Sequence, residues 1–177
     1  MKIGFIGAGR VGCSLGKYLK ESGSGWELVG YYSRSAASAQ EAADFTESKV
    51  FTDLRQLATV CDVIAVTTAD GAIADVWHRL CDCMDQWEHQ IVLHCSGALA
   101  STVFDGADAR GVTAVSLHPF YAVSDRYHSY QTLGEALFTL EGSGERLQEL
   151  DACLRAAGLT IQRISAESKT AYHAAAS

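Results

Sequence analysis

Residues 4–16 read GFIGAGRVGCSLG and place Gly7, Gly9 and Gly12 in the spacing G-x-G-x-x-G. An apolar, strand-like segment directly precedes the motif, and an amphipathic, helix-like segment begins inside it. The glycine spacing alone is a weak signal, but this order of strand, glycine turn and helix is specific. The stretch therefore predicts a βαβ unit at the start of the chain.

Each glycine of the motif has its own physical role. Gly7 permits the tight turn, Gly9 lets the backbone approach a pyrophosphate, and Gly12 lets the helix pack on the strand. Unpaired N–H groups at the helix N-terminus add donors for the same phosphates. A strand-to-helix corner without a ligand is the alternative. We predict a dinucleotide site that includes Gly7, Ala8, Gly9, Arg10, Val11 and Gly12.

Strand-like and helix-like segments alternate along the rest of the chain, which is typical of a parallel sheet. The predicted strands are residues 2–6, 26–32, 48–51, 62–67, 90–95, 112–117, 136–141 and 159–164. The predicted helices are residues 10–22, 36–46, 53–59, 70–85, 99–106 and 144–157, with a long loop over 119–134. We predict an α/β fold with a doubly wound, mostly parallel Rossmann sheet that binds NAD(P).

The second predicted strand is followed by Ser33, Arg34 and Ser35. A carboxylate that accepts hydrogen bonds from the NAD ribose is usual at this point, and none is present. An arginine flanked by hydroxyl groups can pair with a 2′-phosphate, so we expect NADP (as NADPH) to be preferred over NAD. Alternatively, Ser35 caps the next helix and Arg34 is a solvated charge.

Further polar residues follow the fourth, fifth and sixth predicted strands, at the edge where ligands of doubly wound folds bind. Asp70 is expected to cap a helix. A histidine there can act as a general acid or base, with a serine hydroxyl as its partner, although a structural role for each is equally open. We assign Thr67, Thr68 and His94 to the cofactor, and Ser96 and His118 to catalysis.

The composition argues against several classes of partner. Acidic residues outnumber basic ones by 21 to 14, and the formal net charge is −7. Nucleic-acid and anionic-membrane binders carry clustered Lys and Arg, so we expect a small-molecule substrate and neither of those partners. A strand begins at once in MKIGFIGAG and leaves no room for a signal peptide, so we expect a cytoplasmic protein.

Cysteine spacing gives no sign of a metal site. The six cysteines lack CxxC spacing and are expected to be reduced core thiols. His78 and Cys81 would share a helix face, but Cys83 would point about 200° away from Cys81. We therefore expect no metal.

Over its whole length the sequence resembles the Rossmann-like family that carries a second, helical domain of unknown function. The segments that carry the resemblance are GFIGAGRVG (4–12), HCSGAL (94–99), SLHPF (116–120), FTLEG (138–142) and SKTAYHAAAS (168–177). It is more distantly similar to pyrroline-carboxylate reductase, deazaflavin-dependent NADP reductase, hydroxyisobutyrate dehydrogenase and prephenate dehydrogenase. In the last, a serine after the fifth strand and a His-Pro after the sixth are catalytic, and these correspond to Ser96 and His118.

The resemblance also implies a domain organisation. Residues 1–165 would form the NAD(P)-binding domain, and residues 166–177 would begin a C-terminal helical domain that is otherwise missing from this chain. That domain would form the far wall of the site and the interface of a homodimer. In related hydroxyacid dehydrogenases a lysine near the start of this helix donates a proton, which implies a catalytic role for Lys169. His173, four residues later, would share its helix face. A solvated helix lysine is the alternative.

Two functions remain open from the sequence. The first is an NADP-dependent oxidoreductase, or its cofactor-binding half, that transfers hydride between the nicotinamide and a small carbonyl or imine substrate. The aromatic loop over residues 118–134 would then be a lid over the substrate or a structural crossover. The second is a dinucleotide-binding sensor or interaction module without turnover.

Overall fold

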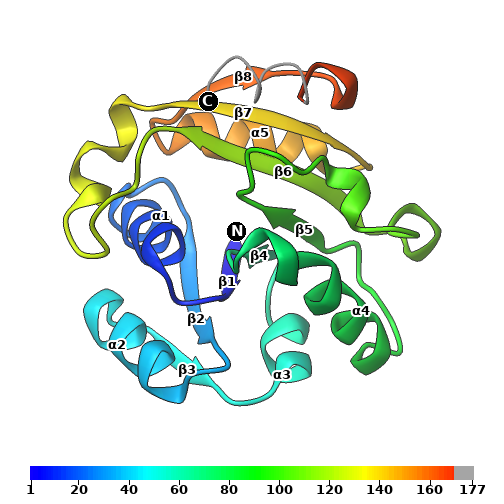
Figure 1. The fold of residues 1–177 in the computed structure, drawn as a ribbon, viewed down its shortest axis with the longest axis horizontal. Helices are drawn as coiled ribbons and strands as arrows, with labels where there is room; N and C mark the ends of the chain where they lie inside the picture. The colour runs from blue at the N-terminus through cyan, green and yellow to red at the C-terminus, as the bar shows by residue number, and fades with distance from the viewer. Residues whose placement is uncertain (170–177) are drawn as a thin grey trace.

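The computed structural model describes residues 1–169, and an eight-stranded sheet lies at its centre (Figure 1). The strand order is β3-β2-β1-β4-β5-β6-β7-β8. Neighbouring strands are parallel except β6 and β7, which are antiparallel. The predicted doubly wound, mostly parallel α/β fold is confirmed. The strands are β1 (Lys2–Ile6), β2 (Glu27–Tyr32), β3 (Lys49–Phe51), β4 (Val63–Val66), β5 (Ile91–His94), β6 (Thr113–Phe120), β7 (Leu137–Ser143) and β8 (Thr160–Arg163).

Helices cover both faces of the sheet, and each face has its own apolar core. Successive side chains of a strand point to opposite faces, so Val63 packs into one core and Ile64 into the other. Both are fully buried, and each such burial contributes roughly 1.5–3 kcal/mol. The first core contains residues of α1 (Arg10–Glu21), α2 (Ala36–Thr46) and α5 (Leu147–Ala156). The second contains residues of α3 (Leu54–Thr59) and α4 (Ile73–Cys83).

Short 3-10 turns complete the connections, and one of them replaces a predicted helix. The expected helix over residues 99–106 is instead η2 (Ser101–Val103). Ser101 donates from its backbone N–H and its hydroxyl to the Glu141 carboxylate, 2.7 Å in each case, which ties the segment to β7. The other turns are η1 (Asp70–Ala72), η3 (Asp108–Arg110) and η4 (Ser129–Glu135).

Strand β6 runs further than predicted and includes Pro119. Its pairing with β5 stops at Ser116, so beyond that residue one side of β6 has no partner strand and a proline is tolerated. On its other side β6 pairs with β7 as far as Phe120. The predicted loop over residues 119–134 therefore begins later and contains the turn η4.

The chain changes direction across the sheet between β1 and β4. From β1 it proceeds outward to β2 and β3, and then returns to β4 on the other side of β1. Thr67, just after β4, donates its backbone N–H to the carbonyl of Ile6 at 2.8 Å, so the two strand ends adjoin. Ligands of doubly wound sheets bind at such a switch point.

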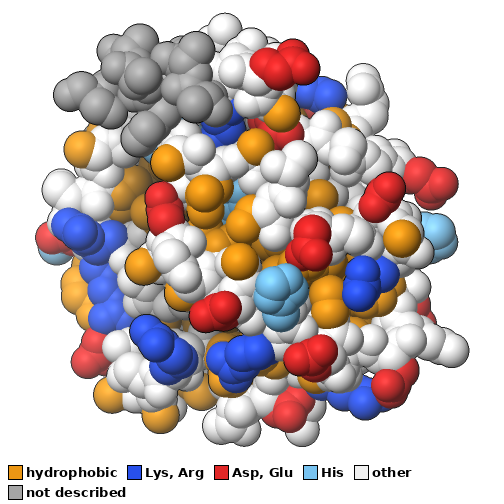
Figure 2. Space-filling view, turned by 45° about the vertical axis from the view of Figure 1, so that its right-hand side comes forward, with side chains coloured by type: hydrophobic (Ala, Val, Ile, Leu, Met, Phe, Trp, Pro, Cys, Tyr) orange, Lys and Arg blue, Asp and Glu red, His pale blue; other side chains and the backbone are white. Residues whose placement is uncertain are grey.

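The surface combines both charge signs. Acidic and basic side chains are interspersed with apolar ones over the face shown in Figure 2. Within residues 1–169, the structure contains no helix that is long and apolar enough to cross a membrane.

Candidate functional site

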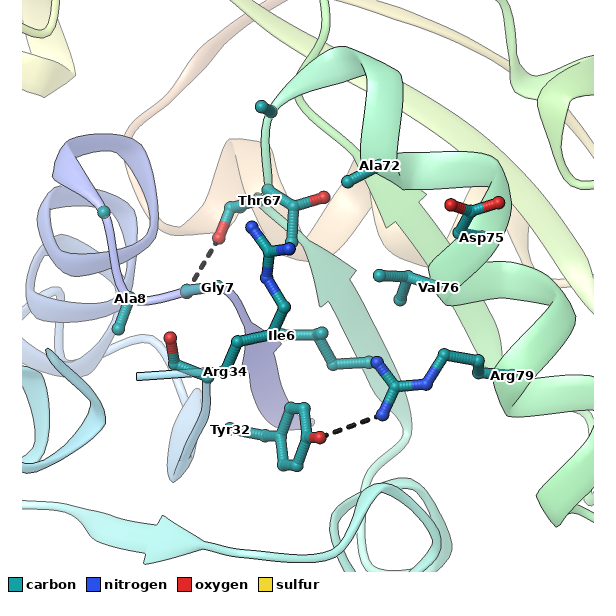
Figure 3. A pocket seen from close by; sticks show the side chains of 14 residues that line it. Ile6, Gly7, Ala8, Tyr32, Arg34, Thr67, Ala72, Asp75, Val76 and Arg79 are labelled. Carbon is teal, nitrogen blue, oxygen red and sulfur yellow. Dashed lines mark hydrogen bonds between the residues drawn. The ribbon is translucent and has the colours of Figure 1, made fainter. Parts of the chain in front are cut away.

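A cavity of about 380 Å³ lies at the carboxyl ends of β1, β2 and β4, next to α4 (Figure 3). The glycine turn, the segment after β2, the segment after β4 and one face of α4 form its wall. It occupies the switch point of the sheet. The lining residues are Ile6, Gly7, Ala8, Gly9, Tyr32, Ser33, Arg34, Thr67, Thr68, Ala69, Ala72, Asp75, Val76 and Arg79.

The glycines differ in what they do for the fold. Gly7 has φ +107°, in the region that favours glycine, and a Cβ there would lie 2.8 Å from backbone atoms of Thr67. A Cβ on Gly12 would lie 2.6 Å from the Thr67 hydroxyl oxygen and 2.8 Å from the Gly7 carbonyl oxygen. A Cβ on Gly9 would meet nothing within 4 Å. The fold therefore requires Gly7 and Gly12, whereas the missing side chain of Gly9 leaves open space at the cavity.

The N-terminus of α1 is uncapped by side chains. Gly9 is the N-cap and offers no side-chain acceptor, and the first turn contains no acidic residue. The positive end of the helix dipole is therefore available to an anion. Arg10 and Val11 lie in this turn but do not line the cavity, and the Arg10 guanidinium donates to the Ser124 carbonyl at 3.5 Å.

Two threonines follow β4 at the cavity wall. The Thr67 hydroxyl donates to the Gly7 carbonyl at 3.0 Å and so fixes the glycine turn against β4 (Figure 3). The Thr68 hydroxyl oxygen is buried and has no hydrogen-bond partner within the described part of the chain. A buried hydroxyl without a partner costs roughly 1–3 kcal/mol, which a ligand bound at the cavity could offset.

In the segment after β2, the serine hydroxyls form hydrogen bonds within the fold, whereas the arginine side chain lines the cavity. The Ser35 hydroxyl accepts a hydrogen bond from the Ser38 N–H at 3.2 Å and caps α2, and the Ser33 hydroxyl accepts one from the Ser35 N–H at 3.3 Å. Arg34 is exposed, and its side chain extends into the cavity toward the segment after β4 (Figure 3). Within residues 1–169, Arg34 has no hydrogen bond or ion pair to a side chain.

A second arginine at the cavity was not predicted. Arg79 of α4 donates from its guanidinium to the Tyr32 hydroxyl at 3.0 Å (Figure 3). The helical spacing of Ala72, the N-cap of α4, and of Val76 and Arg79 within it places the three on one side, and this was the signal in the sequence that could have identified Arg79.

Ser96 links the turn after β5 to the turn after β4. Its hydroxyl donates to the Asp70 carboxylate at 2.8 Å and accepts hydrogen bonds from the N–H groups of Ala98 and Leu99, each at 3.1 Å. A hydroxyl has one donor and two acceptor positions, so all of them are used. Asp70 does not cap α4 as expected, because its carboxylate faces Ser96 and it belongs to η1.

The ring of His94, which the sequence assigns to the cofactor, is held within the fold. The side chain is fully buried; Nε2 lies 3.1 Å from the Ala100 carbonyl, and Nδ1 accepts a hydrogen bond from the Ser96 N–H at 3.1 Å. Both ring nitrogens are used within the fold. Burial lowers the pKa of His94 to about 4, despite the Ala100 carbonyl, so the imidazole is neutral near pH 7.

Lys169 lies against the sheet and is only 2% exposed. Its ammonium donates to the Ser96 carbonyl at 2.9 Å and to the Ser116 hydroxyl. Burial lowers the pKa of Lys169 to about 8, while the negative charge of Glu141 opposes that shift. The solvated-lysine alternative does not describe this side chain.

Glu141, which was not predicted as a site residue, is a buried carboxylate in the same part of the sheet. It pairs with Ser116 across β7 and β6, and Ser116 pairs with His94 across β6 and β5. These polar residues therefore form one row across three adjacent strands. The segment FTLEG is an apolar strand with a single acid, and this was the only sequence signal for a buried charge.

His118 lies near this row, at the carboxyl end of β6. Its Nδ1 is 3.2 Å from the Cys95 carbonyl, an acceptor, so the proton sits on Nδ1 and Nε2 is the basic nitrogen. His173 lies outside the described residues.

The segment between β6 and β7 packs on α1 and α2. Arg126 donates to the Cys13 sulfur at 3.2 Å, to the Glu41 carboxylate at 2.6 Å and to the Ser38 carbonyl at 2.8 Å. The ring of Tyr127 packs edge-on against Phe45 of α2, with centroids 4.9 Å apart. These contacts describe a structural crossover, one of the two expected roles of the segment.

Comparison with known families agrees with this architecture. A model of the Rossmann-like domain matches residues 1–119. This range includes the glycine turn, the cavity and the strand ends that carry Ser96 and His118. No curated protein matches the chain.

Solved structures with the same fold cover nearly the whole chain. The Bacteroides fragilis protein BF3122, a proposed NADP oxidoreductase, is 25% identical with a TM-score of 0.78, over 99% of this chain and 64% of its own. The Thermotoga maritima protein TM1727 is 23% identical with a TM-score of 0.71, over 98% and 61%. Prephenate dehydrogenase from A. aeolicus, solved with hydroxyphenyl propionate and NAD+, is 17% identical with a TM-score of 0.77, over 96% and 61%. The chain thus spans about three fifths of their length.

Proposed function

The chain belongs to the Rossmann-like domain family, and from that membership we propose that it is an NADP-dependent oxidoreductase or the cofactor-binding half of one. The substrate would be a small molecule with a carbonyl or imine carbon. The observation that carries the proposal is the cavity at the switch point, into which Arg34 extends without an ion-pair partner in residues 1–169. The similarity to a proposed NADP oxidoreductase supports the same cofactor.

The residues of the cavity are suited to the pyrophosphate and the 2′-phosphate of NADP. The open space at Gly9 and the uncapped start of α1 suit the pyrophosphate, with Gly7, Ala8 and the first-turn residues Arg10, Val11 and Gly12 as its backbone cradle. The unpartnered Thr68 hydroxyl would bind next to it. Arg34, with Ser33 and Ser35 beside it, would pair with the 2′-phosphate. When bound, the nicotinamide would supply hydride chemistry.

Proton transfer would fall to residues near the ends of β5 and β6. His118, whose Nδ1 lies 3.2 Å from the Cys95 carbonyl, would take part in the proton transfer. The lowered pKa of Lys169 makes both protonation states accessible close to neutral pH, as a proton donor requires. Ser96 would hold Asp70 and the turn after β5 in place. His173 remains proposed from the sequence alone.

A dinucleotide-binding module without turnover is the second candidate. Two observations favour the binding module. Every hydrogen-bonding position of the Ser96 hydroxyl is used within the fold, and the His94 side chain is fully buried. The two candidates share the cofactor site and differ in chemistry. For the oxidoreductase we propose a cytoplasmic homodimer whose C-terminal helical segment, from residue 166, forms the second wall of the site.

Calorimetry with NADPH and NADH tests the cofactor assignment. We expect NADPH to bind more tightly, and Arg34→Ala to remove most of the difference, roughly tenfold or more, because a charge-assisted bond to phosphate is lost. Arg163→Ala is the matched control, since Arg163 is an exposed arginine on β8 that pairs with Asp151. Equal affinity of the parent chain for both cofactors would refute the NADP preference.

Turnover separates the two candidate functions. NADPH oxidation should be followed by absorbance against a panel of small carbonyl and imine compounds. Oxidation that depends on the substrate and falls in His118→Gln supports the oxidoreductase. Tight NADPH binding without oxidation of any panel member supports the binding module.

A further inference from the structure

Arg79 reaches the candidate cofactor cavity from the opposite wall to Arg34. It stands on α4, and its guanidinium carbon lies 6.0 Å from the centre of the Tyr32 ring. The guanidinium donates to the Tyr32 hydroxyl at 3.0 Å, so its position is fixed by a side chain of β2 (Figure 3). A long, exposed arginine is ordinarily mobile, and this bond keeps its charge at the cavity.

Two guanidinium groups therefore line the cavity, that of Arg79 beside Tyr32 at the end of β2 and that of Arg34 pointing toward the segment after β4 (Figure 3). Neither forms an ion pair within residues 1–169, although ten ion pairs occur elsewhere in this part of the chain. Asp75 is the one acid in the lining, and in Figure 3 its carboxylate lies on the far side of Val76 from the Arg79 guanidinium. Two unpaired positive charges in one cavity are complementary to a dianion.

Tyr32 adds a neutral donor to this pair. Its hydroxyl accepts from Arg79, so its own hydrogen is available to an acceptor, and within residues 1–169 no acceptor for it is found. The cavity thus has three donors for an anion. Two are guanidinium groups, from Arg34 and Arg79, and the third is the hydroxyl of Tyr32. A phosphate monoester presents three terminal oxygens and close to two negative charges, which matches that set.

We propose that Arg79, positioned by Tyr32, is a second specificity-determining residue that binds the 2′-phosphate opposite Arg34. The inference rests on the proposed function, because it assigns a further residue to the same cofactor. It differs from that proposal in adding a residue of α4, Arg79, which lies 45 residues after Arg34 in the sequence.

The test uses two fragments of the cofactor that differ only in the phosphate under question. Calorimetry with 2′,5′-ADP and with 5′-AMP is performed on the parent chain, Arg79→Ala, Tyr32→Phe and the control Arg163→Ala. We expect Arg79→Ala to weaken 2′,5′-ADP roughly ten- to a hundredfold while 5′-AMP changes by less than about threefold. Tyr32→Phe should weaken 2′,5′-ADP by a smaller factor, and the control should leave both ligands unchanged.

Each other outcome contradicts the assignment. Equal weakening of both fragments in Arg79→Ala would mean that the arginine acts on a part that they share, such as the 5′-phosphate or the adenine, and no change would mean that it contacts neither fragment. Arg79→Lys retains the positive charge but lacks the two-pronged guanidinium, and it controls for a loss of folding in Arg79→Ala. It should recover part of the 2′,5′-ADP affinity. If the parent binds NADPH while Arg79→Ala retains the parent affinity for 2′,5′-ADP, only this inference fails. If the parent binds neither NADPH nor 2′,5′-ADP, the proposed function fails and the inference falls with it.

Discussion

The hydroxyl of Ser96 donates a hydrogen bond of 2.8 Å to the carboxylate of Asp70, and so connects the turns that follow β5 and β4. The same hydroxyl accepts from the N–H groups of Ala98 and Leu99. One small side chain therefore satisfies three groups at the edge of the sheet next to the candidate cofactor cavity. Its removal should affect stability before it affects cofactor binding.

We expect Ser96→Ala to lower the free energy of unfolding by roughly 1–3 kcal/mol, because two N–H groups and a carboxylate lose their partner. Urea denaturation measures the change. Ser96→Thr keeps the hydroxyl and should retain more of the stability. Parent-like stability of Ser96→Ala would show that water replaces all of these bonds.

The glycines of the turn should respond differently to substitution. Gly9→Val is expected to fold and to lose NADPH binding, because its side chain fills open space next to the cavity. Gly12→Ala is expected to destabilise the fold, since its Cβ would lie 2.6 Å from the Thr67 hydroxyl oxygen and 2.8 Å from the Gly7 carbonyl oxygen. Circular dichroism and calorimetry distinguish the two effects. A Gly9→Val chain that folds and binds NADPH like the parent would show that the pyrophosphate lies elsewhere.

Acid should destabilise the protein through His94. The pKa of His94 is about 4 in the folded state, below its ordinary value of 6.5, because the ring is buried. The unfolded chain therefore takes up a proton first as the pH falls, and about 2 kcal/mol of stability is lost between pH 7 and pH 5. His94→Gln keeps a donor and an acceptor without titrating. Its urea midpoint should fall less over this pH range than that of the parent, and an equal fall would contradict the prediction.

Alkaline pH should act in the opposite direction through Lys169. Burial lowers its folded-state pKa to about 8 from 10.5. Between these values the folded chain has lost the proton and the unfolded chain retains it, so stability rises with pH by up to about 3 kcal/mol. NMR titration of the Lys169 side chain checks the pKa. Glu141→Gln should lower the pKa further, because the carboxylate charge favours the ammonium, and a rise would contradict this arrangement.

The fold was predictable because its signals are local. The glycine turn, the apolar strands and the helical periodicity each depend on neighbouring residues, and Arg34 follows a strand at a position where its chemistry is informative. Arg79 was missed because its helical spacing from Ala72 and Val76 becomes informative only once that face of the helix is known to line the cavity. The prediction of a helix over residues 99–106 was wrong because Ser101 forms hydrogen bonds with Glu141, which lies forty residues away in the sequence.

Polar residues at strand ends were the least predictable part. His94 and His118 follow similar apolar strands, but only the structure distinguishes a fully buried ring from a half-buried one. Lys169 and Glu141 are charged residues that the sequence would place at the surface. Their burial depends on a row of polar residues across three strands, which is a tertiary arrangement.

The antiparallel pairing of β6 and β7 has an evolutionary consequence. Phe120, the last residue of β6, pairs with Leu137, the first residue of β7, so this connection starts and ends at the same edge of the sheet as the candidate cofactor cavity. A parallel connection must carry the chain back to the opposite edge. Insertions between these two residues can therefore reshape the ligand edge without shifting the register of any strand. Doubling the length of such a loop costs only about 0.6 kcal/mol, so the length of this segment can change with little loss of stability.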